Sequence, residues 1–272
     1  MEQSIASARK PNFLKKIVQS FGSFVIDDIK GLGDFALFTI KFFYWSVKPP
    51  FRVKLGFDQL FFIGNKSVFI VCLTGAFTGM VMAYQMYYGS KLISMDTFVG
   101  PIVSMSLARE LSPVLTGLIV AGRAGAAMAA QIGTMKVTEQ IDALEVMGVD
   151  ANQYLAVPRI LAGTIALPIL TIIHGFVGNL GSYLIGTKVL GIDEVMYFSK
   201  LSQLMFLEDF FQGIIKAFFF GFIIACIGTY HGFSVSGGAE GVGKGTNLAV
   251  VWGMITVLVV DFFLTSFLVH IL

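Results

Sequence analysis

The sequence predicts an all-α protein that crosses a membrane with five helices. Of its 272 residues, 56% are hydrophobic and only 13% are charged, whereas soluble domains carry roughly 25% charged residues. The mean hydropathy is +0.79. Five apolar stretches reach the length of about 20 residues that a helix needs to cross the hydrocarbon core. Lipid is therefore the solvent for most of this chain, and an ordinary soluble domain is excluded.

Composition also excludes several kinds of function. The formal net charge is +2, and the basic residues form no cluster of the kind that binds nucleic acid. Cys72 and Cys226 lie inside apolar runs, without the spacing of metal ligands or of a disulfide framework. His174, His231 and His270 have no carboxylate or cysteine partners at ligand spacing. We therefore predict no metal site, no catalytic centre and no nucleic-acid partner.

The beginning of the chain is predicted to stay in the cytoplasm. Residues 1–12 are polar and lack an apolar segment with a cleavage site, so a secretory signal peptide is not expected. Apolar residues recur at helical spacing over residues 13–29, which is typical of a helix on the membrane surface. The next apolar stretch, residues 35–47, is too short to cross and ends at Pro49-Pro50. We interpret it as a re-entrant or elbow helix.

Residues 1–66 thus form an N-terminal arm, and residues 67–272 form the transmembrane domain. Translocated loops carry few lysines and arginines. With the N-terminus in the cytoplasm, fourteen of the nineteen Lys and Arg residues lie on the cytoplasmic side, and only Lys91, Lys188 and Lys200 lie outside. Five spans then place the C-terminus outside. The spans are expected at residues 68–88, 98–121, 157–185, 210–230 and 248–271.

Two loops between the spans have amphipathic patterns of their own. In the cytoplasmic loop at about residues 134–148, four apolar residues share one face of a helix and three acidic residues share another. The apolar residues are Val137, Ile141, Leu144 and Met147, and the acidic residues are Glu139, Asp142 and Glu145. An acidic face matches an anionic leaflet poorly, so we expect a soluble cytoplasmic partner there. The external loop, at about residues 186–209, contains a second amphipathic segment.

Residues 238–245 come close to the P-loop pattern but do not complete it. Gly245 stands where the pattern requires the hydroxyl that binds magnesium, and the segment joins two spans where a strand-to-helix turn is required. We interpret the segment as a flexible glycine-rich turn. The chain itself is therefore not expected to hydrolyse a nucleotide.

Small residues recur inside the spans. Gly75 and Gly79 are four residues apart in the first span, and Gly175, Gly178 and Gly181 follow each other in the third. Such spacing lets helix backbones approach closely in lipid. We expect these glycines to serve packing within one chain rather than a dimer seam.

Four ionisable residues lie inside the predicted spans: Arg109 and Glu110 in the second, Lys216 in the fourth and Asp261 in the fifth. A charge near the bilayer centre costs about 2.5–3.5 kcal/mol, so such groups usually face a bundle interior or a water-filled cavity. Lys216 can bridge the two carboxylates or present its ammonium to an anionic ligand. The pattern leaves both a structural charge network and a binding site open. Arg109 points about 100° away from Glu110, toward a different contact, and Pro113 is expected to bend this span.

Three longer runs of residues resemble the MlaE/YrbE family, the permease subunits of MCE-type lipid ABC transporters. The runs are Leu107-Ala-Arg-Glu-Leu-Ser-Pro-Val114, Ala121-Gly-Arg-Ala-Gly-Ala-Ala-Met-Ala-Ala-Gln-Ile-Gly133 and Thr138-Glu-Gln-Ile-Asp-Ala-Leu-Glu-Val-Met147. The resemblance continues through Pro158-Arg159, Lys216 and Val260-Asp261-Phe262. It covers nearly the whole chain beyond the N-terminal arm.

The resemblance implies a homodimeric ABC-transporter permease, not an enzyme, in the bacterial inner membrane, with its C-terminus in the periplasm. It implies as partners two copies of an ABC ATPase, a hexameric MCE-domain protein and a small STAS-domain protein. The ATPase would bind ATP and Mg²⁺, so this chain would hold no cofactor. The complex would move phospholipids between the inner membrane and the outer envelope and so act on outer-membrane asymmetry.

The resemblance also assigns roles to residues. A lipid cavity at the dimer interface would be lined by Glu110, Lys216, Asp261 and Arg109. A coupling helix would dock on the ATPase through Thr138, Glu139, Gln140, Asp142, Leu144 and Glu145.

Two other classes of function stay open: a secondary transporter of lipid or small molecules that works without an ATPase, and an intramembrane lipid enzyme.

Overall fold

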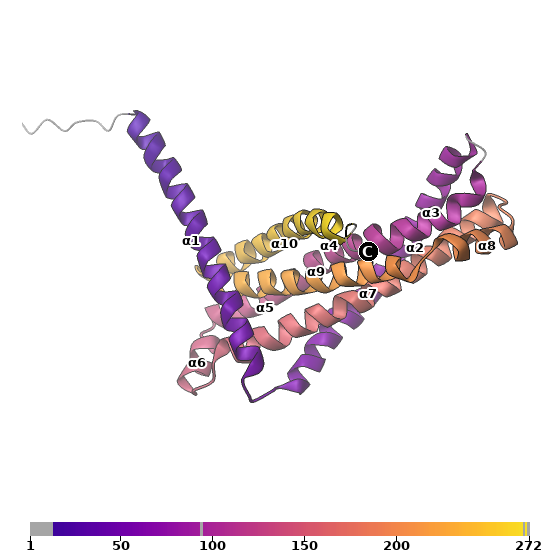
Figure 1. Ribbon diagram of the computed structural model, residues 1–272. Coiled ribbons are helices and arrows are strands. Elements are labelled where there is room, and N and C mark those ends of the chain that lie inside the picture. The colour runs from indigo at the N-terminus through magenta and orange to yellow at the C-terminus, as the bar shows by residue number, and fades with distance from the viewer. Residues whose placement is uncertain (1–12, 93–94, 269, 271–272) are drawn as a thin grey trace, which may run out of the picture.

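The computed structural model describes residues 13–92, 95–268 and 270, and every regular element in these ranges is a helix. Five helical segments are long and apolar enough to cross a membrane. They run along the bundle that occupies the centre of Figure 1. The predicted all-α fold with five membrane-spanning helices is therefore confirmed.

Three of the spans are single helices and two are composite. The single helices are α2 (Val53–Lys91), α9 (Leu207–Phe233) and α10 (Gly238–Leu268). The second span joins η1 (Asp96–Phe98), α3 (Val99–Ser106), η2 (Leu107–Leu111), α4 (Ser112–Val120), η3 (Ala121–Gly125) and α5 (Ala126–Val137). The third joins η4 (Asn152–Ala156), α7 (Val157–Tyr183) and η5 (Leu184–Val189). The segments η2 to η5 are π-helical turns. Outside the spans lie α1 (Phe13–Val47), α6 (Gln140–Val146) and α8 (Glu194–Leu204).

The N-terminal part differs from the prediction of two helices at residues 13–29 and 35–47, because α1 is one continuous helix. The two glycines between these stretches lower helix stability by about 1 kcal/mol each, which does not suffice to break the helix. Its second half is held by packing, since Phe38 and Phe42 are buried against aromatic rings of α9. Residues 1–12 of the predicted arm lie outside the described residues.

The first span is longer than the sequence predicted. The chain turns at Pro49-Pro50, and α2 begins at Val53, well before the expected start at residue 68. The proposed division between residues 66 and 67 therefore falls inside a helix. Hydropathy failed to locate the start because polar residues such as Asp58 and Lys66 interrupt the apolar run while the backbone stays helical.

The glycine-rich segment before the last span is a second correction. We predicted a flexible turn over residues 238–245, but α10 begins at Gly238. The turn itself is shorter, and Gly237 and Gly238 adopt positive φ values of 88° and 70° there. Inside the helix, a Cβ at Gly245 would approach the side chain of Val235 to 2.7 Å. At least this glycine serves close packing within a helix rather than loop flexibility.

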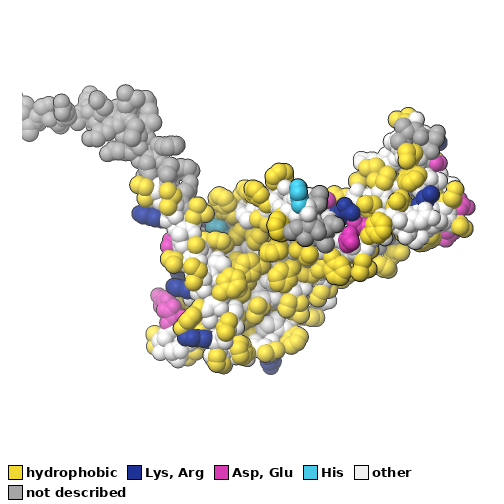
Figure 2. Space-filling model, viewed as in Figure 1, with side chains coloured by type: hydrophobic (Ala, Val, Ile, Leu, Met, Phe, Trp, Pro, Cys, Tyr) yellow, Lys and Arg dark blue, Asp and Glu magenta, His cyan; other side chains and the backbone are white. Residues whose placement is uncertain are grey.

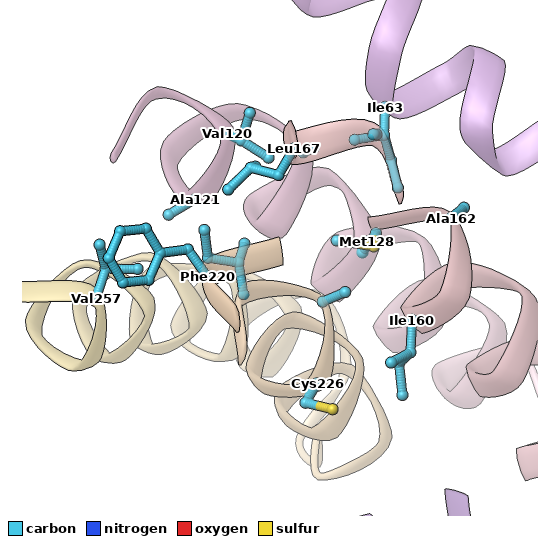
Figure 3. Packing of buried hydrophobic residues seen from close by; sticks show 14 of the residues in the cluster. Ile63, Val120, Ala121, Met128, Ile160, Ala162, Leu167, Phe220, Cys226 and Val257 are labelled. Atoms are coloured by element: carbon cyan, nitrogen blue, oxygen red, sulfur yellow. The ribbon is translucent and has the colours of Figure 1, made fainter. Parts of the chain in front are cut away.

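The core of the bundle draws on all five spans. Figure 3 shows Ile63, Met128, Leu167, Phe220 and Val257, one from each span, and all five are fully buried. They meet in a single large hydrophobic cluster. In a bilayer such packing must work through shape, because lipid tails remove most of the hydrophobic driving force between helices.

Glycines bring the helices together as expected. The most extensive helix pair is α2 with α7. A Cβ at Gly79 would overlap the carbonyl oxygen of Gly178, and a Cβ at Gly181 would lie 2.6 Å from the carbonyl oxygen of Ala76. Both contacts lie within one chain, so the prediction of intrachain packing is confirmed for these glycines.

The two ends of the bundle carry different short helices, and Figure 1 shows α6 and α8 at opposite ends. In Figure 2, hydrophobic side chains cover most of the middle of the visible face, while most charged side chains gather toward its ends. One small group of charged side chains lies in the middle, beside the grey C-terminal residues. The visible surface is thus mostly apolar along the middle and charged toward the ends, as a membrane-spanning bundle requires.

The external amphipathic segment folds into α8, which packs through one main side chain. Asp193 caps its start by accepting a hydrogen bond from the backbone nitrogen of Met196 at 2.9 Å. Tyr197 is buried, and burial raises the pKa of its phenol. Phe198 and Val195 are exposed, so the apolar face predicted from the pattern is only partly covered. The hydroxyl of Tyr183, in the third span, donates a hydrogen bond to Glu194 and lowers the pKa of its carboxyl group.

Candidate functional site

Three spans bring three of the predicted ionisable residues into one cluster. Lys216 of α9 forms ion pairs with Glu110 of η2 and with Asp261 of α10. The distance from Lys216 Nζ to Asp261 Oδ1 is 3.1 Å. Of the two possibilities that the sequence left open for Lys216, the structure therefore shows the bridge between two carboxylates.

A threonine that the sequence analysis missed completes this cluster. The Nζ of Lys216 donates a hydrogen bond to Thr265 Oγ1 at 2.6 Å, and Thr265 Oγ1 lies 3.4 Å from both carboxylate oxygens of Glu110. The threonine hydroxyl also donates to the backbone carbonyl of Asp261 at 2.8 Å. Thr265 is one helical turn after Asp261, so helical spacing alone could have identified it.

Lys216 is buried, whereas its acidic partners reach the surface. The exposed side-chain fractions are 1% for Lys216, 21% for Asp261 and 39% for Glu110. The ammonium of Lys216 donates hydrogen bonds to Glu110 and to Thr265, and Asp261 joins the cluster through the ion pair without a hydrogen bond at its Oδ1. Lys216 is therefore the most buried member of the cluster, and Glu110 is the most exposed. Lys216, Glu110 and Asp261 together carry a formal charge of −1.

A local change of helix type places Glu110. Leu107 to Leu111 form a π-helical turn, and Pro113 follows in the first turn of α4. Proline has no backbone N–H and its ring collides with the carbonyl one turn earlier, so regular α-helical hydrogen bonding is not expected to continue through this point. A Cβ at Gly213 of α9 would overlap the carbonyl oxygen of Ala108, so α9 packs directly on this turn. Where the sequence predicted a bend at Pro113, the structure has a π-helical turn directly before it.

Arg109 belongs to a separate ion pair, as its direction on the helix indicated. Its guanidinium pairs with Asp209 at the start of α9. Asp209 is fully buried and also accepts a hydrogen bond from the backbone nitrogen of Phe206 at 2.9 Å. The side chain of Arg109 is 35% exposed. Asp209 was not predicted from the sequence, because it lies just before the expected fourth span, where an acidic residue is unremarkable.

A cavity lies on another side of the same π-helical turn. It measures about 300 Å³ and is lined by apolar side chains and by a few polar ones, including Ser112 and Thr171. Ser112 Oγ lies 3.1 Å from Nδ1 of His174, which is fully buried. Glu110 does not line this cavity. The charge cluster and the cavity are therefore distinct features.

The predicted coupling segment is a shorter helix than the pattern indicated. We expected a helix at about residues 134–148, but α5 reaches Val137 and α6 covers Gln140–Val146. Glu139 has a φ of 58°, a left-handed conformation that is uncommon outside glycine. It separates α6 from α5. Ile141 is buried and Leu144 is half-buried in a small cluster with α5 and η4.

The acidic face of this segment is exposed. Glu139, Asp142 and Glu145 are all exposed, as are Thr138 and Gln140. Within the described ranges, none of the three acidic side chains forms an ion pair. Val137 and Met147 are exposed as well, so only half of the predicted apolar face packs on the chain itself.

Comparisons with known proteins agree over most of the chain. The family described as Permease MlaE matches residues 57–267. A probable ABC transporter permease protein of Rickettsia typhi is 41% identical over 255 residues, which are 94% of this chain and 98% of the relative. A probable ABC transporter permease protein of Synechocystis is 40% identical, over 76% of this chain and 79% of the relative. The intermembrane phospholipid transport system permease protein MlaE of Haemophilus influenzae is 35% identical, over 92% and 96%.

Proposed function

Because this chain belongs to the MlaE family of ABC transporter permeases, we propose that it is the membrane subunit of an ATP-driven phospholipid transporter. The observation that carries the proposal is the 35% identity, over 92% of the chain, to a relative named for intermembrane phospholipid transport. The relatives are named as transport components, not enzymes. The five apolar spans agree with a multi-pass protein of the inner membrane.

A second copy of the chain would cover the charge cluster. Glu110 is 39% exposed in the single chain, and a charge facing lipid near the bilayer centre costs about 2.5–3.5 kcal/mol. In the last span, which contributes Asp261, only 17% of the residues in an 18-residue apolar stretch are buried, the smallest share among the spans of the described residues. Lipid can cover an apolar face but not Glu110. A homodimer with a polar cavity between the two copies removes this cost.

Within that cavity, Glu110 and Arg109 would be the groups that meet a lipid headgroup. Both reach the surface, and each is held by a buried partner, Lys216 for Glu110 and Asp209 for Arg109. A zwitterionic headgroup has a phosphate and an ammonium group, which match the guanidinium and the carboxylate. Acyl chains would lie on the exposed apolar side chains of the spans. Lys216, Asp261 and Thr265 position Glu110 without contacting lipid.

At one end of the bundle, α6 would dock on the ATPase with its acidic face, so that ATP and Mg²⁺ are bound by the partner. This end would be cytoplasmic, as the excess of basic residues indicates. A hexameric MCE-domain protein would receive or deliver lipid at the opposite end, near α8. A STAS-domain protein would join on the ATPase side.

The test is phospholipid transfer by the native complex reconstituted in vesicles that contain a fluorescent phospholipid. Lys216→Ala should reduce ATP-dependent transfer by tenfold or more, while the ATPase stays bound. The matched control is Lys244→Ala, because Lys244 forms an exposed ion pair with Glu240 at 2.7 Å. Unchanged transfer by Lys216→Ala, or full transfer without ATP, would contradict the proposal. The second result would favour a secondary transporter.

A charge-neutral variant separates ligand binding from a structural role. Glu110→Gln, Lys216→Met and Asp261→Asn together remove the whole ion cluster, and replacing a buried ion network by neutral groups is often tolerated. If the cluster only holds helices together, this variant should restore transfer. If Glu110 meets the headgroup, transfer should stay low in a complex of normal thermal stability.

A further inference from the structure

A second cavity lies where α1, α2 and α7 meet, away from the charge cluster. It measures about 250 Å³. Its wall is almost entirely apolar and includes Trp45, Phe57, Leu60 and Ile165. The amide of Gln153 donates a hydrogen bond to the carbonyl of Lys48 at 2.9 Å and so ties η4, which precedes α7, to the residue that follows α1 beside the cavity. The cavity is therefore built from α1 and α2, which are consecutive in the chain, and from η4 and α7, which are far from them in sequence.

Basic side chains stand at the rim of this apolar cavity. Lys48 and Arg52 line it, and Lys54 is exposed at the start of α2. The Nζ of Lys48 lies 4.1 Å from the ring centre of Tyr44, and the Cζ of Arg52 lies 4.4 Å from that of Tyr154. These cation–π contacts hold the charges in place and leave them without a carboxylate partner in the described residues.

The position of the rim suits the boundary between lipid and water. The chain leaves α1, turns at two prolines and enters the first span here. Tyr and Trp side chains are enriched at membrane interfaces, and Tyr44 and Trp45 lie next to the rim. The one acidic side chain nearby in sequence is Asp58, one turn beyond Lys54 on α2, and it does not line the cavity.

We propose that this cavity holds one acyl chain of an anionic phospholipid from the adjacent leaflet, with the phosphate bound by Lys48 and Arg52. An apolar wall fits the acyl chain, and a basic rim fits the anionic headgroup. Each basic residue near a membrane surface raises the affinity for anionic lipid about fivefold. The site stands apart from the proposed transport cavity and does not depend on it. A bound lipid would join α1 to α2 and α7.

Trp45 provides the probe, because the chain has only two tryptophans. In a Trp252→Phe background, the full-length chain is reconstituted into phosphatidylcholine vesicles containing an equal minor fraction of brominated phosphatidylglycerol or brominated phosphatidylcholine. Bromine on the acyl chain quenches tryptophan at contact. Phosphatidylglycerol should quench Trp45 fivefold or more efficiently than phosphatidylcholine, and Lys48→Gln with Arg52→Gln should abolish this preference.

A second variant fills the cavity without touching its charges. Gly56 lines the cavity, and a Cβ added there meets no atom within 4 Å. Gly56→Leu should therefore reduce the preferential quenching to that of phosphatidylcholine. Gly64→Leu is the matched control, because Gly64 has the same open surroundings on the same helix and does not line the cavity. Equal quenching by the two lipids, or a preference that survives Gly56→Leu, would overturn the proposal.

Discussion

At the scale of single residues, the glycines of α2 and α7 set how closely these helices pack. The atoms that a new Cβ would strike belong to the opposing backbone, which cannot rotate away as a side chain can. At Gly79 the obstacle is the carbonyl oxygen of Gly178. Overpacking of this kind typically costs about 1–3 kcal/mol, with the upper end expected where backbone meets backbone.

Gly79→Ala should therefore lower the thermal unfolding midpoint of the purified protein in detergent, with a loss of stability of about 1–3 kcal/mol. The measurement is a thermal shift followed by circular dichroism. Gly64→Ala is the control, because no atom lies within 4 Å of a Cβ there and alanine favours the helix. A midpoint for Gly79→Ala at or above that of the control would show that α2 and α7 do not pack as described.

At the scale of elements, α6 combines one anchored side and one free side. Ile141 anchors it to the bundle, while its acidic residues point to solvent and lack ion-pair partners in the described part of the chain. A rigid element with an unpaired acidic face fits a basic surface on a soluble partner. Charges at such a rim steer association and set specificity.

Charge reversal at Glu139, Asp142 and Glu145 to Lys should release the ATPase or uncouple its ATP hydrolysis from lipid transfer. Co-purification of an ATP-hydrolysing partner and transfer by the reconstituted complex are the two measurements. The control is Glu208→Lys, an exposed acidic residue at the opposite end of the bundle. Normal recovery of the complex together with normal transfer by the triple variant would defeat the coupling role of α6.

At the scale of the whole molecule, the exposed charge cluster and the poorly buried last span lie on one side of the bundle. Phe262 is next to Asp261 and is 70% exposed. A two-fold dimer uses the same patch on both copies, so residues near the axis approach their own counterparts. Burying this side accounts for both features with one interface.

A cysteine at Phe262 should therefore crosslink to its counterpart in the other copy when a short bifunctional thiol reagent is added in membranes. Cys72 and Cys226 are replaced first, so that the new thiol reacts alone. Ile169→Cys is the control, since Ile169 is half-exposed on α7 and that helix has no extensive contact with α10. The proposed interface would be excluded if neither variant formed a crosslinked dimer, or if only the Ile169→Cys variant did.

The sequence was most informative where spacing and chemistry are local. Hydropathy located all five spans, and the cost of charge in lipid singled out Glu110, Lys216 and Asp261, which do meet. Element ends were less predictable: α1 runs through its glycines and α10 begins inside the glycine-rich segment. Helix continuity depends on packing along the whole element, which a local pattern does not record.

By itself, the sequence determined that the chain is solvated by lipid, that it crosses five times, and which charges are too costly to face lipid. These properties follow from composition and transfer free energy, which need no partner. Only the tertiary structure decided that Lys216 bridges two carboxylates, that Arg109 pairs with Asp209 and that α1, α2 and α7 enclose a basic-rimmed cavity. Each depends on side chains far apart in sequence, and helix packing alone brings them within contact distance.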